Sequence, residues 1–397
     1  SPTPYVVPTI PVASPTPYVV PTTPVTATTP LVVPSISSSM DPGSTSESTL
    51  PTVTARNTIG NPRVRMGHLL RRAGFGASRR ELDVFLEIGE EKTVSFLLEY
   101  GRIDDTDLDK RLTELNLDPV ERHKDLQQTS LIRMVYTKRP LQEKMVLFWH
   151  GLLTSAWRKV GRGPYMLDQD ELFRQHAMSP YDGLLKAVSM DPAMLIWLDS
   201  RVNKKDKPNE NFARELMELF SMGVGTFTED DVKASARAFT GWSLRKKVFF
   251  FEEHQHDFGM KTFLGNTGNY DGNGIIDIIM KQPVTSRFIS TKLFEFFAFE
   301  NPEPQTISRL SKIFNDAGYS IQAVVKEILT SEEFYSDRAY RTKIKSPAEL
   351  VAGTIRSLDI ETNAKNVANN YLTSMGQELF NPFDVSGWPD GKEWINS

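Results

Sequence analysis

The run of acidic and amide side chains between residues 209 and 218 is the stretch of this sequence best equipped for chemistry. Paired carboxylates beside an arginine suit general acid–base catalysis or the binding of a hard cation. Asp199 precedes the run by a short loop and can reach the same place. The alternative is a salt-bridge network that fixes the helix register. The polar residues of the run are Asn209, Glu210, Asn211, Arg214, Glu215 and Glu218.

Arg214 is predicted to lie at the centre of the polar interior of the fold. Its helix carries phenylalanine and leucine on other sides, which predicts that its neighbours are buried. A buried guanidinium must be paired, because an unpaired one is very costly. We therefore expect Arg214 to bond to one or more of Asp199, Glu210 and Glu218.

The histidines of the chain are spread out, and none of them has the HExxH spacing of a zinc-binding helix. His150 lies inside an apolar helix, directly after Phe148 and Trp149, and is a candidate catalytic residue. The alternative is a core histidine that is held by a hydrogen bond.

Two further stretches carry side chains that suit a divalent cation. In the first, two histidines alternate as on one face of a strand, with an aspartate beside them. The second imitates a calcium loop, but methionine stands where that loop needs a bidentate glutamate, so an Asx-rich turn is favoured. No other cofactor is expected. The candidate metal ligands are His254, His256 and Asp257 in the first stretch, and Asp271, Asn273 and Asp277 in the second.

From about residue 61 onward, apolar residues recur with helical spacing between turn and cap residues. The candidate catalytic run is itself a helix, and the next helix begins with a capping box made by Thr228 and Asp231. Helical spacing lapses near 244–265, where an aromatic run predicts a small β-hairpin or an irregular excursion. These patterns predict an all-α fold, with one large multi-helix domain over 56–397.

Two aromatic segments are expected to be buried in this domain. The helix that begins at Pro140 presents a broad apolar face that includes Phe148 and Trp149. The last residues of the chain form turns and carry Trp388 and Trp394, so this tail is predicted to pack back on the core.

The first 55 residues differ in kind from the rest of the chain. They open with two copies of a thirteen-residue repeat, SPTPYVVPTIPVA and SPTPYVVPTTPVT. Frequent proline removes backbone donors and favours extended conformations. This composition predicts a stiff Pro/Thr-rich stalk or linker over 1–55, for which O-glycosylation is one reading; the alternative is a disordered tail that acts only as a spacer.

The composition excludes several classes of function. A net charge of -4 gives no electrostatic case for binding nucleic acid. The chain has no cysteine, which excludes disulfides, thiolate metal sites and a cysteine nucleophile. No apolar run approaches the length of a membrane span, so no span is predicted.

The domain resembles a bacterial family catalogued as domain of unknown function 1800. The resemblance runs in order from about residue 61 to the end of the sequence and implies a mostly helical fold. It also implies export, and hence an extracellular, cell-surface or periplasmic location, but no reaction. The motifs that carry it are HLLRRAGFG, EKMVLFWHGLLTS, DPAMLIWLD, PNENFARELMELFSMGVGTFTEDDVKASARAFTGW, HDFGMKTFLG and GWPDGKEWIN.

Two functions from different classes agree with these observations. The first is a cell-envelope-associated structural or interaction protein, displayed at the surface, whose partners are other envelope proteins or polysaccharide. The second is an envelope hydrolase or other enzyme that uses Asp199, Glu210, Glu215 and Glu218, with or without a divalent metal. A deep pocket lined by these carboxylates would favour the enzyme, and a cluster sealed under aromatic side chains would favour the interaction protein.

Overall fold

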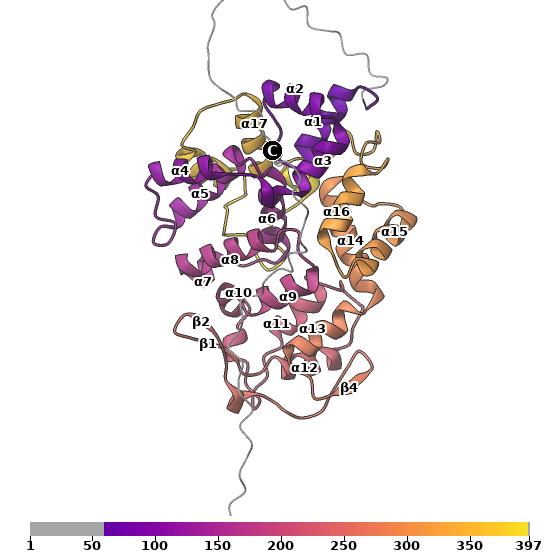
Figure 1. Ribbon diagram of the computed structural model, residues 1–397. Helices are drawn as coiled ribbons and strands as arrows, with labels where there is room; N and C mark the ends of the chain where they lie inside the picture. Colours follow the sequence, from indigo (N-terminus) through magenta and orange to yellow (C-terminus); the bar gives the residue numbers. More distant parts are fainter. Residues whose placement is uncertain (1–58, 396–397) are drawn as a thin grey trace, which may run out of the picture. The chain divides into compact units, whose positions relative to one another are not determined.

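The computed structural model describes residues 59–395 of the chain (Figure 1). The predicted stalk over 1–55 lies outside the described residues. Among the helices that the structure describes, none combines the length and the apolar character needed to cross a membrane.

The described part of the chain is built mainly from α-helices, as the all-α prediction expects. Many of them begin at proline or at a side-chain cap, which is why their starts could be predicted. The α-helices are α1 (Pro62–Arg72), α2 (Arg79–Ile88), α3 (Glu90–Leu98), α4 (Thr106–Glu114), α5 (His123–Tyr136), α6 (Pro140–Leu152), α7 (Trp157–Val160), α8 (Gly163–Gln175), α9 (Tyr181–Ser189), α10 (Pro192–Trp197), α11 (Asn211–Glu218), α12 (Glu229–Ala238), α13 (Gly272–Met280), α14 (Pro283–Phe297), α15 (Pro304–Asp316), α16 (Ile321–Thr330), α17 (Pro347–Ser357) and α18 (Leu372–Ser374).

Shorter helical turns connect these elements. Four are 3-10 turns, and the fifth is a single π-helical turn that runs directly into α18. They are η1 (Tyr100–Arg102), η2 (Ser200–Val202), η3 (Glu253–Gln255), η4 (Val367–Tyr371) and η5 (Gly391–Trp394).

The excursion predicted near 244–265 consists of two antiparallel hairpins. Strand β1 (Trp242–Arg245) pairs with β2 (Val248–Phe251), and β3 (Lys261–Phe263) pairs with β4 (Asn266–Gly268). Each turn places two residues in the left-handed region, which is the geometry of the tight turns preferred in hairpins. The residues of these turns are Lys246 and Lys247 in the first hairpin, and Leu264 and Gly265 in the second.

Helix α6 lies at the centre of the fold and is buried on all its sides from Pro140 to His150 (Figure 1). The sequence predicted a broad apolar face for it. The structure also buries its polar side chains Gln142, Glu143 and Lys144, so each of them needs a partner from another element.

The C-terminal tail packs back on the core, as predicted. The indole of Trp388 meets the ring of His150 edge to face, with 4.9 Å between the ring centroids. Gly387 has a φ of +96°, and a Cβ there would lie 2.3 Å from the carbonyl oxygen of Gly151. Only glycine therefore lets the tail approach the end of α6 this closely.

Helix α17, close to the C-terminal end of the sequence, lies among the first helices of the chain (Figure 1). Its Arg356 forms an ion pair with Glu81 of α2, at 3.0 Å. A Cβ on Gly353 would lie 3.0 Å from the carbonyl oxygen of Phe75, in the turn that follows α1. Gly353 therefore permits the close approach of α17 to this turn.

We predict that Gly353→Ala lowers the free energy of unfolding by about 1–3 kcal/mol, because the added methyl group meets a backbone atom that cannot move easily. Gly183→Ala in α9 is the matched control, since a Cβ there meets nothing within 4 Å. We expect the control to raise stability by about 0.5–1 kcal/mol, the usual gain for alanine in a helix. Chemical denaturation of both variants measures the difference, and equal effects would contradict the packing argument.

Candidate functional site

The acidic run predicted as a catalytic site lies on α11, at the surface of the described domain. The guanidinium of Arg214 pairs with Glu229 at 2.7 Å and with Glu210 at 3.5 Å, and its side chain is 34% exposed. The predicted bond to Glu210 is therefore present, but the predicted place at the centre of the polar interior is wrong. Phe212 and Leu216 take the buried side of α11, and Arg214, two positions from each, points to the other side.

The other acidic candidates separate into two places. Asp199 bonds to the Nζ of Lys159 at 2.8 Å, and among the described residues it makes no ion pair with Arg214. Glu215 is half-buried, and burial together with the charge of Glu218 raises its pKa. The charge of Asp384 in the C-terminal tail raises the pKa of Glu215 further.

His150 is buried in α6, and its Nε2 accepts a hydrogen bond from the backbone N–H of Phe380 at 3.1 Å. Burial lowers the pKa of His150 to about 3, so the ring is neutral at ordinary pH. This is the environment of a core histidine held by a hydrogen bond, the alternative that the sequence left open. In this position His150 ties α6 to the C-terminal tail.

The first candidate metal stretch does not converge on one point. His254 is 70% exposed. His256 is buried, and its Nδ1–H donates to the carbonyl oxygen of Thr240 at 2.7 Å. Asp257 bonds to Arg237 at 2.6 Å.

The second candidate stretch forms the start of a helix rather than a loop. Asp271 caps α13 and accepts a hydrogen bond from the N–H of Gly274 at 2.8 Å, as an Asx-rich turn does. Asn273 lies in the first turn of the helix, and Asp277 pairs with Lys186 at 2.6 Å. Over residues 59–395, no group of three or more histidine, aspartate or glutamate side chains is placed to hold a metal ion.

The best-formed candidate site was not predicted from the sequence. It is a cavity of about 560 Å³ between the end of α1, the segment before α17 and the first turn of α17, and we call it the cationic pocket. Five of the residues that line it are cationic, and one is a carboxylate. These charged residues are Arg71, Arg72, Arg341, Lys343, Lys345 and Glu349.

The single carboxylate of the cationic pocket is already paired. Glu349 forms an ion pair with Lys144 of α6, and the two side chains are only 6% and 1% exposed. Burial alone would raise the pKa of Glu349, but Lys144, Lys343 and Arg72 outweigh it and hold that pKa well below its usual range. Burial lowers the pKa of Lys144 to about 8, so both members of the pair are charged at neutral pH.

Two of the cations are occupied by the C-terminal end of α14. Arg72 donates to the carbonyl oxygen of Phe297 at 2.8 Å and to that of Phe296 at 2.6 Å. Lys343 donates to the carbonyl oxygen of Glu295 at 3.0 Å. The last carbonyls of a helix have no partners within it and carry partial negative charge, so cations are stable there.

The remaining three cations, Arg71, Arg341 and Lys345, form no ion pair with any residue in the described range. Burial lowers the pKa of Arg71 and of Lys345, and neighbouring cations lower both further, although Tyr340 acts to raise the pKa of Arg71 and Glu349 acts to raise that of Lys345. His68 adds no charge at neutral pH, because burial and then Arg72 lower its pKa to about 4. The cationic pocket therefore holds more cations than carboxylates, and three of the cations form no ion pair with a described residue.

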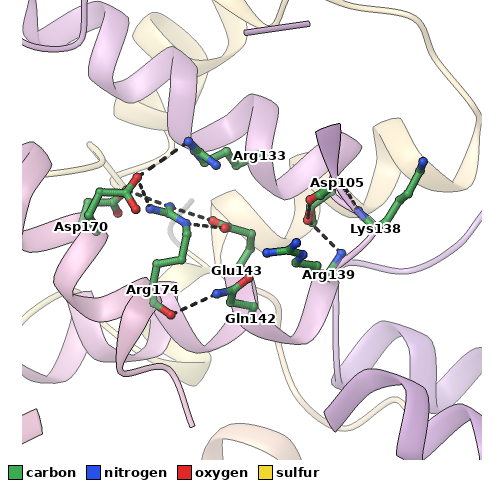
Figure 2. A network of polar contacts seen from close by, with 10 residues as sticks. Asp105, Arg133, Lys138, Arg139, Gln142, Glu143, Asp170 and Arg174 are labelled. Atoms are coloured by element: carbon green, nitrogen blue, oxygen red, sulfur yellow. Dashed lines mark hydrogen bonds and ion pairs between the residues drawn. The ribbon is translucent and has the colours of Figure 1, made fainter. Parts of the chain in front are cut away.

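A second buried network, on α6 and α8, has no excess of positive charge (Figure 2). Arg174 bonds to Glu143 at 2.6 Å and to Asp170 at 2.9 Å, and all three side chains are buried. Gln142 donates to the carbonyl oxygen of Arg174 at 3.1 Å. Because two carboxylates face its one guanidinium, this network joins helices and leaves no positive charge for an anion.

The cations of the cationic pocket come from two segments that lie far apart in the sequence. One part is the Arg71–Arg72 pair, within a motif that carries the family resemblance, and the other is the basic segment RTKIK at 341–345. Either part alone is typical of a solvated basic surface. Only the tertiary structure brings them together, in one cavity.

Comparison with known proteins gives one match. A family model described as "Protein of unknown function (DUF1800)" matches residues 68–397. No curated protein and no solved structure matches the chain. The match includes all the residues that line the cationic pocket.

We predict that Glu349→Gln lowers the free energy of unfolding at pH 7 by about 3–5 kcal/mol, the usual cost of leaving a buried charge without its partner. The double variant Lys144→Met with Glu349→Gln is the control, because it removes both charges and should recover most of this loss.

The pH dependence of stability gives a second readout of the same pair. The folded pKa of Glu349 is lowered from its ordinary value of 4.5, so its stabilisation is complete above that pH and is lost as the pH falls below it. The difference between the parent protein and Glu349→Gln should therefore shrink below about pH 4.5 in denaturation curves. A difference that stays constant down to pH 3 would contradict the ion pair.

Proposed function

The chain belongs to the family described as "Protein of unknown function (DUF1800)", and from this premise we propose that it is a binding protein whose cationic pocket takes an anionic group. The observation that carries this proposal is the excess of cations in this pocket, where Arg71, Arg341 and Lys345 form no ion pair with a described residue. A ligand that supplies negative charge would relieve the repulsion among them. The proposal agrees with the interaction protein predicted from the sequence and gives it a site.

The chemistry of the pocket suits a carboxylate, sulfate or phosphate group. A guanidinium offers parallel N–H donors that match two oxygens of such a group, and an ammonium adds a mobile point charge. At the effective dielectric constant of partly buried sites, one unit charge pair 4 Å apart interacts by about 4 kcal/mol. With several cations around one cavity, this attraction outweighs the cost of removing a small anion from water.

Export and display at the cell surface complete the proposal. They are supported by the family resemblance of residues 61–397 and by the Pro/Thr-rich composition of residues 1–55. A binding domain on a stalk could hold other envelope proteins or polysaccharide. An anionic group on such a partner is the feature that the cationic pocket would recognise.

Titration calorimetry with inorganic phosphate and inorganic sulfate tests the binding proposal. We predict measurable binding that weakens with added salt, and a loss of at least about tenfold in affinity in the double variant Arg71→Gln with Lys345→Gln, because two of the cations that face the ligand are removed. The matched control is Lys110→Gln with Lys312→Gln, which removes two exposed cations elsewhere. Absence of binding, or equal loss in both double variants, would contradict the proposal.

A hydrolase that acts through Glu215, with or without a divalent cation, is the second candidate function. It is favoured by one observation, the raised pKa of this half-buried carboxyl beside Glu218. A carboxyl that stays protonated nearer to neutral pH can act as a general acid.

We predict for this second candidate that Glu215→Gln abolishes any hydrolysis found in a screen of chromogenic glycosides, esters and phosphate esters. The melting temperature should change little, because the amide has nearly the shape of the acid. Glu114→Gln, at an exposed position on α4, is the matched control and should keep the activity. Activity that survives Glu215→Gln would remove Glu215 from this role.

A further inference from the structure

A second cavity, of about 210 Å³, adjoins the cationic pocket, and four of the residues that line it are aromatic. We call it the tryptophan cavity because Trp388 and Trp394 of the C-terminal tail line it, together with Phe148 and Phe296. Lys343 and Glu349 line both cavities, so the two cavities lie on either side of these side chains.

The tryptophan cavity is amphipathic. Among its aromatic walls it carries the carboxylates Glu295 and Asp390, the amide Gln377 and the hydroxyl Ser386. Large aromatic faces bind apolar surface, while a few placed polar groups fix the orientation of a ligand. A sugar ring is likewise amphipathic, because it has C–H groups on its faces and hydroxyl donors around its edge. Carboxylate and amide oxygens are the acceptors that such hydroxyls need.

A third cavity, of about 310 Å³, also includes Lys343 in its walls. It carries two further cations, Arg338 and Lys392, and the guanidinium of Arg338 lies 4.2 Å from the ring centroid of Phe299. Lys343 therefore lines three neighbouring cavities, whose walls carry both cationic and aromatic side chains. This arrangement suits a ligand of several units better than a single small anion.

We propose that the ligand is an acidic oligosaccharide, with an anionic substituent in the cationic pocket and a neighbouring sugar ring against Trp388 and Trp394. This inference rests on the anion binding proposed above and specifies the class of molecule that carries the anion. A nucleotide also combines an anion with a ring. It fits less well, because a planar base offers fewer donors to Glu295 and Asp390 than the hydroxyl groups of a sugar ring do.

The walls of the tryptophan cavity are held in place before any ligand binds. The indole of Trp388 packs against the ring of His150, which is itself fixed by the N–H of Phe380. The turn that bears Trp394 begins at Gly391, where φ is +57° and a Cβ would lie 2.6 Å from a carboxylate oxygen of Glu300. A preformed site loses little conformational entropy on binding, which favours affinity.

Binding measurements on the whole chain with five probes test the inference. The probes are an oligogalacturonate hexamer, a sulfated hexasaccharide, the neutral maltohexaose, inorganic sulfate and uridine monophosphate. We expect at least one acidic hexasaccharide to bind at least tenfold more tightly than inorganic sulfate, and at least tenfold more tightly than maltohexaose. The two acidic sugars distinguish a carboxylate ligand from a sulfate ester.

Single variants assign the effect to the cavity. Trp394→Ala should reduce the affinity for the acidic hexasaccharide about tenfold and leave the affinity for inorganic sulfate unchanged. Trp388→Phe gives a second measurement that keeps an aromatic ring against His150, should Trp394→Ala lower the melting temperature. Phe258→Ala is the control, since this aromatic side chain is 53% exposed and lines none of the three cavities.

The outcomes separate the two proposals. If inorganic sulfate binds but neither acidic sugar binds more tightly, or if uridine monophosphate binds best, the inference is overturned while anion binding stands. If sulfate and the acidic sugars all fail to bind, anion binding fails and the inference fails with it. An acidic sugar whose advantage over sulfate survives both tryptophan variants also overturns the inference.

Discussion

The complete burial of helix α6 is the constraint on which the rest of the structure depends. A buried polar group costs free energy unless another group bonds to it, so each polar side chain of α6 requires a partner from a different element. Gln142 and Glu143 find theirs on α8, Lys144 finds Glu349 on α17, and His150 finds the backbone N–H of Phe380. Segments far apart in the sequence are thereby attached to one helix, and α17 and the C-terminal tail are positioned by polar contacts as well as by apolar packing.

Local patterns were sufficient to predict most elements of the fold. The capping box at Thr228 and the proline at Pro140 lie at true helix starts, because capping depends only on residues within one turn. Local patterns carry no sign that Lys144 is buried. Its partner Glu349 is 205 positions away, and no periodicity reveals such a pair. For Arg214 the prediction of burial was wrong. It used the apolar neighbours of Arg214 as evidence, but they occupy the other side of α11.

The candidate site was harder to predict for a related physical reason. A search for reactive residues in sequence finds groups that are close along the chain, such as the acidic run on α11. The cationic pocket joins Arg71 and Arg72, at the end of α1, to Lys343 and Lys345, just before α17. These residues come together only because both elements pack near α6. The charge of each segment is visible in the sequence, but their sum within one cavity is a property of the tertiary structure.

The ion pair between Lys144 and Glu349 connects the stability of the domain to the charge of its pocket. A free carboxylate at Glu349 would neutralise one of the cations around it and weaken the attraction for an anion. Because Glu349 is already paired with Lys144, its negative charge is neutralised by Lys144 within the core. The carbonyl groups at the end of α14 similarly hold Arg72 and Lys343 in position. The fold thus satisfies the cations that it buries most deeply, and it leaves Arg71, Arg341 and Lys345, which are less buried, without an ion pair to a described residue.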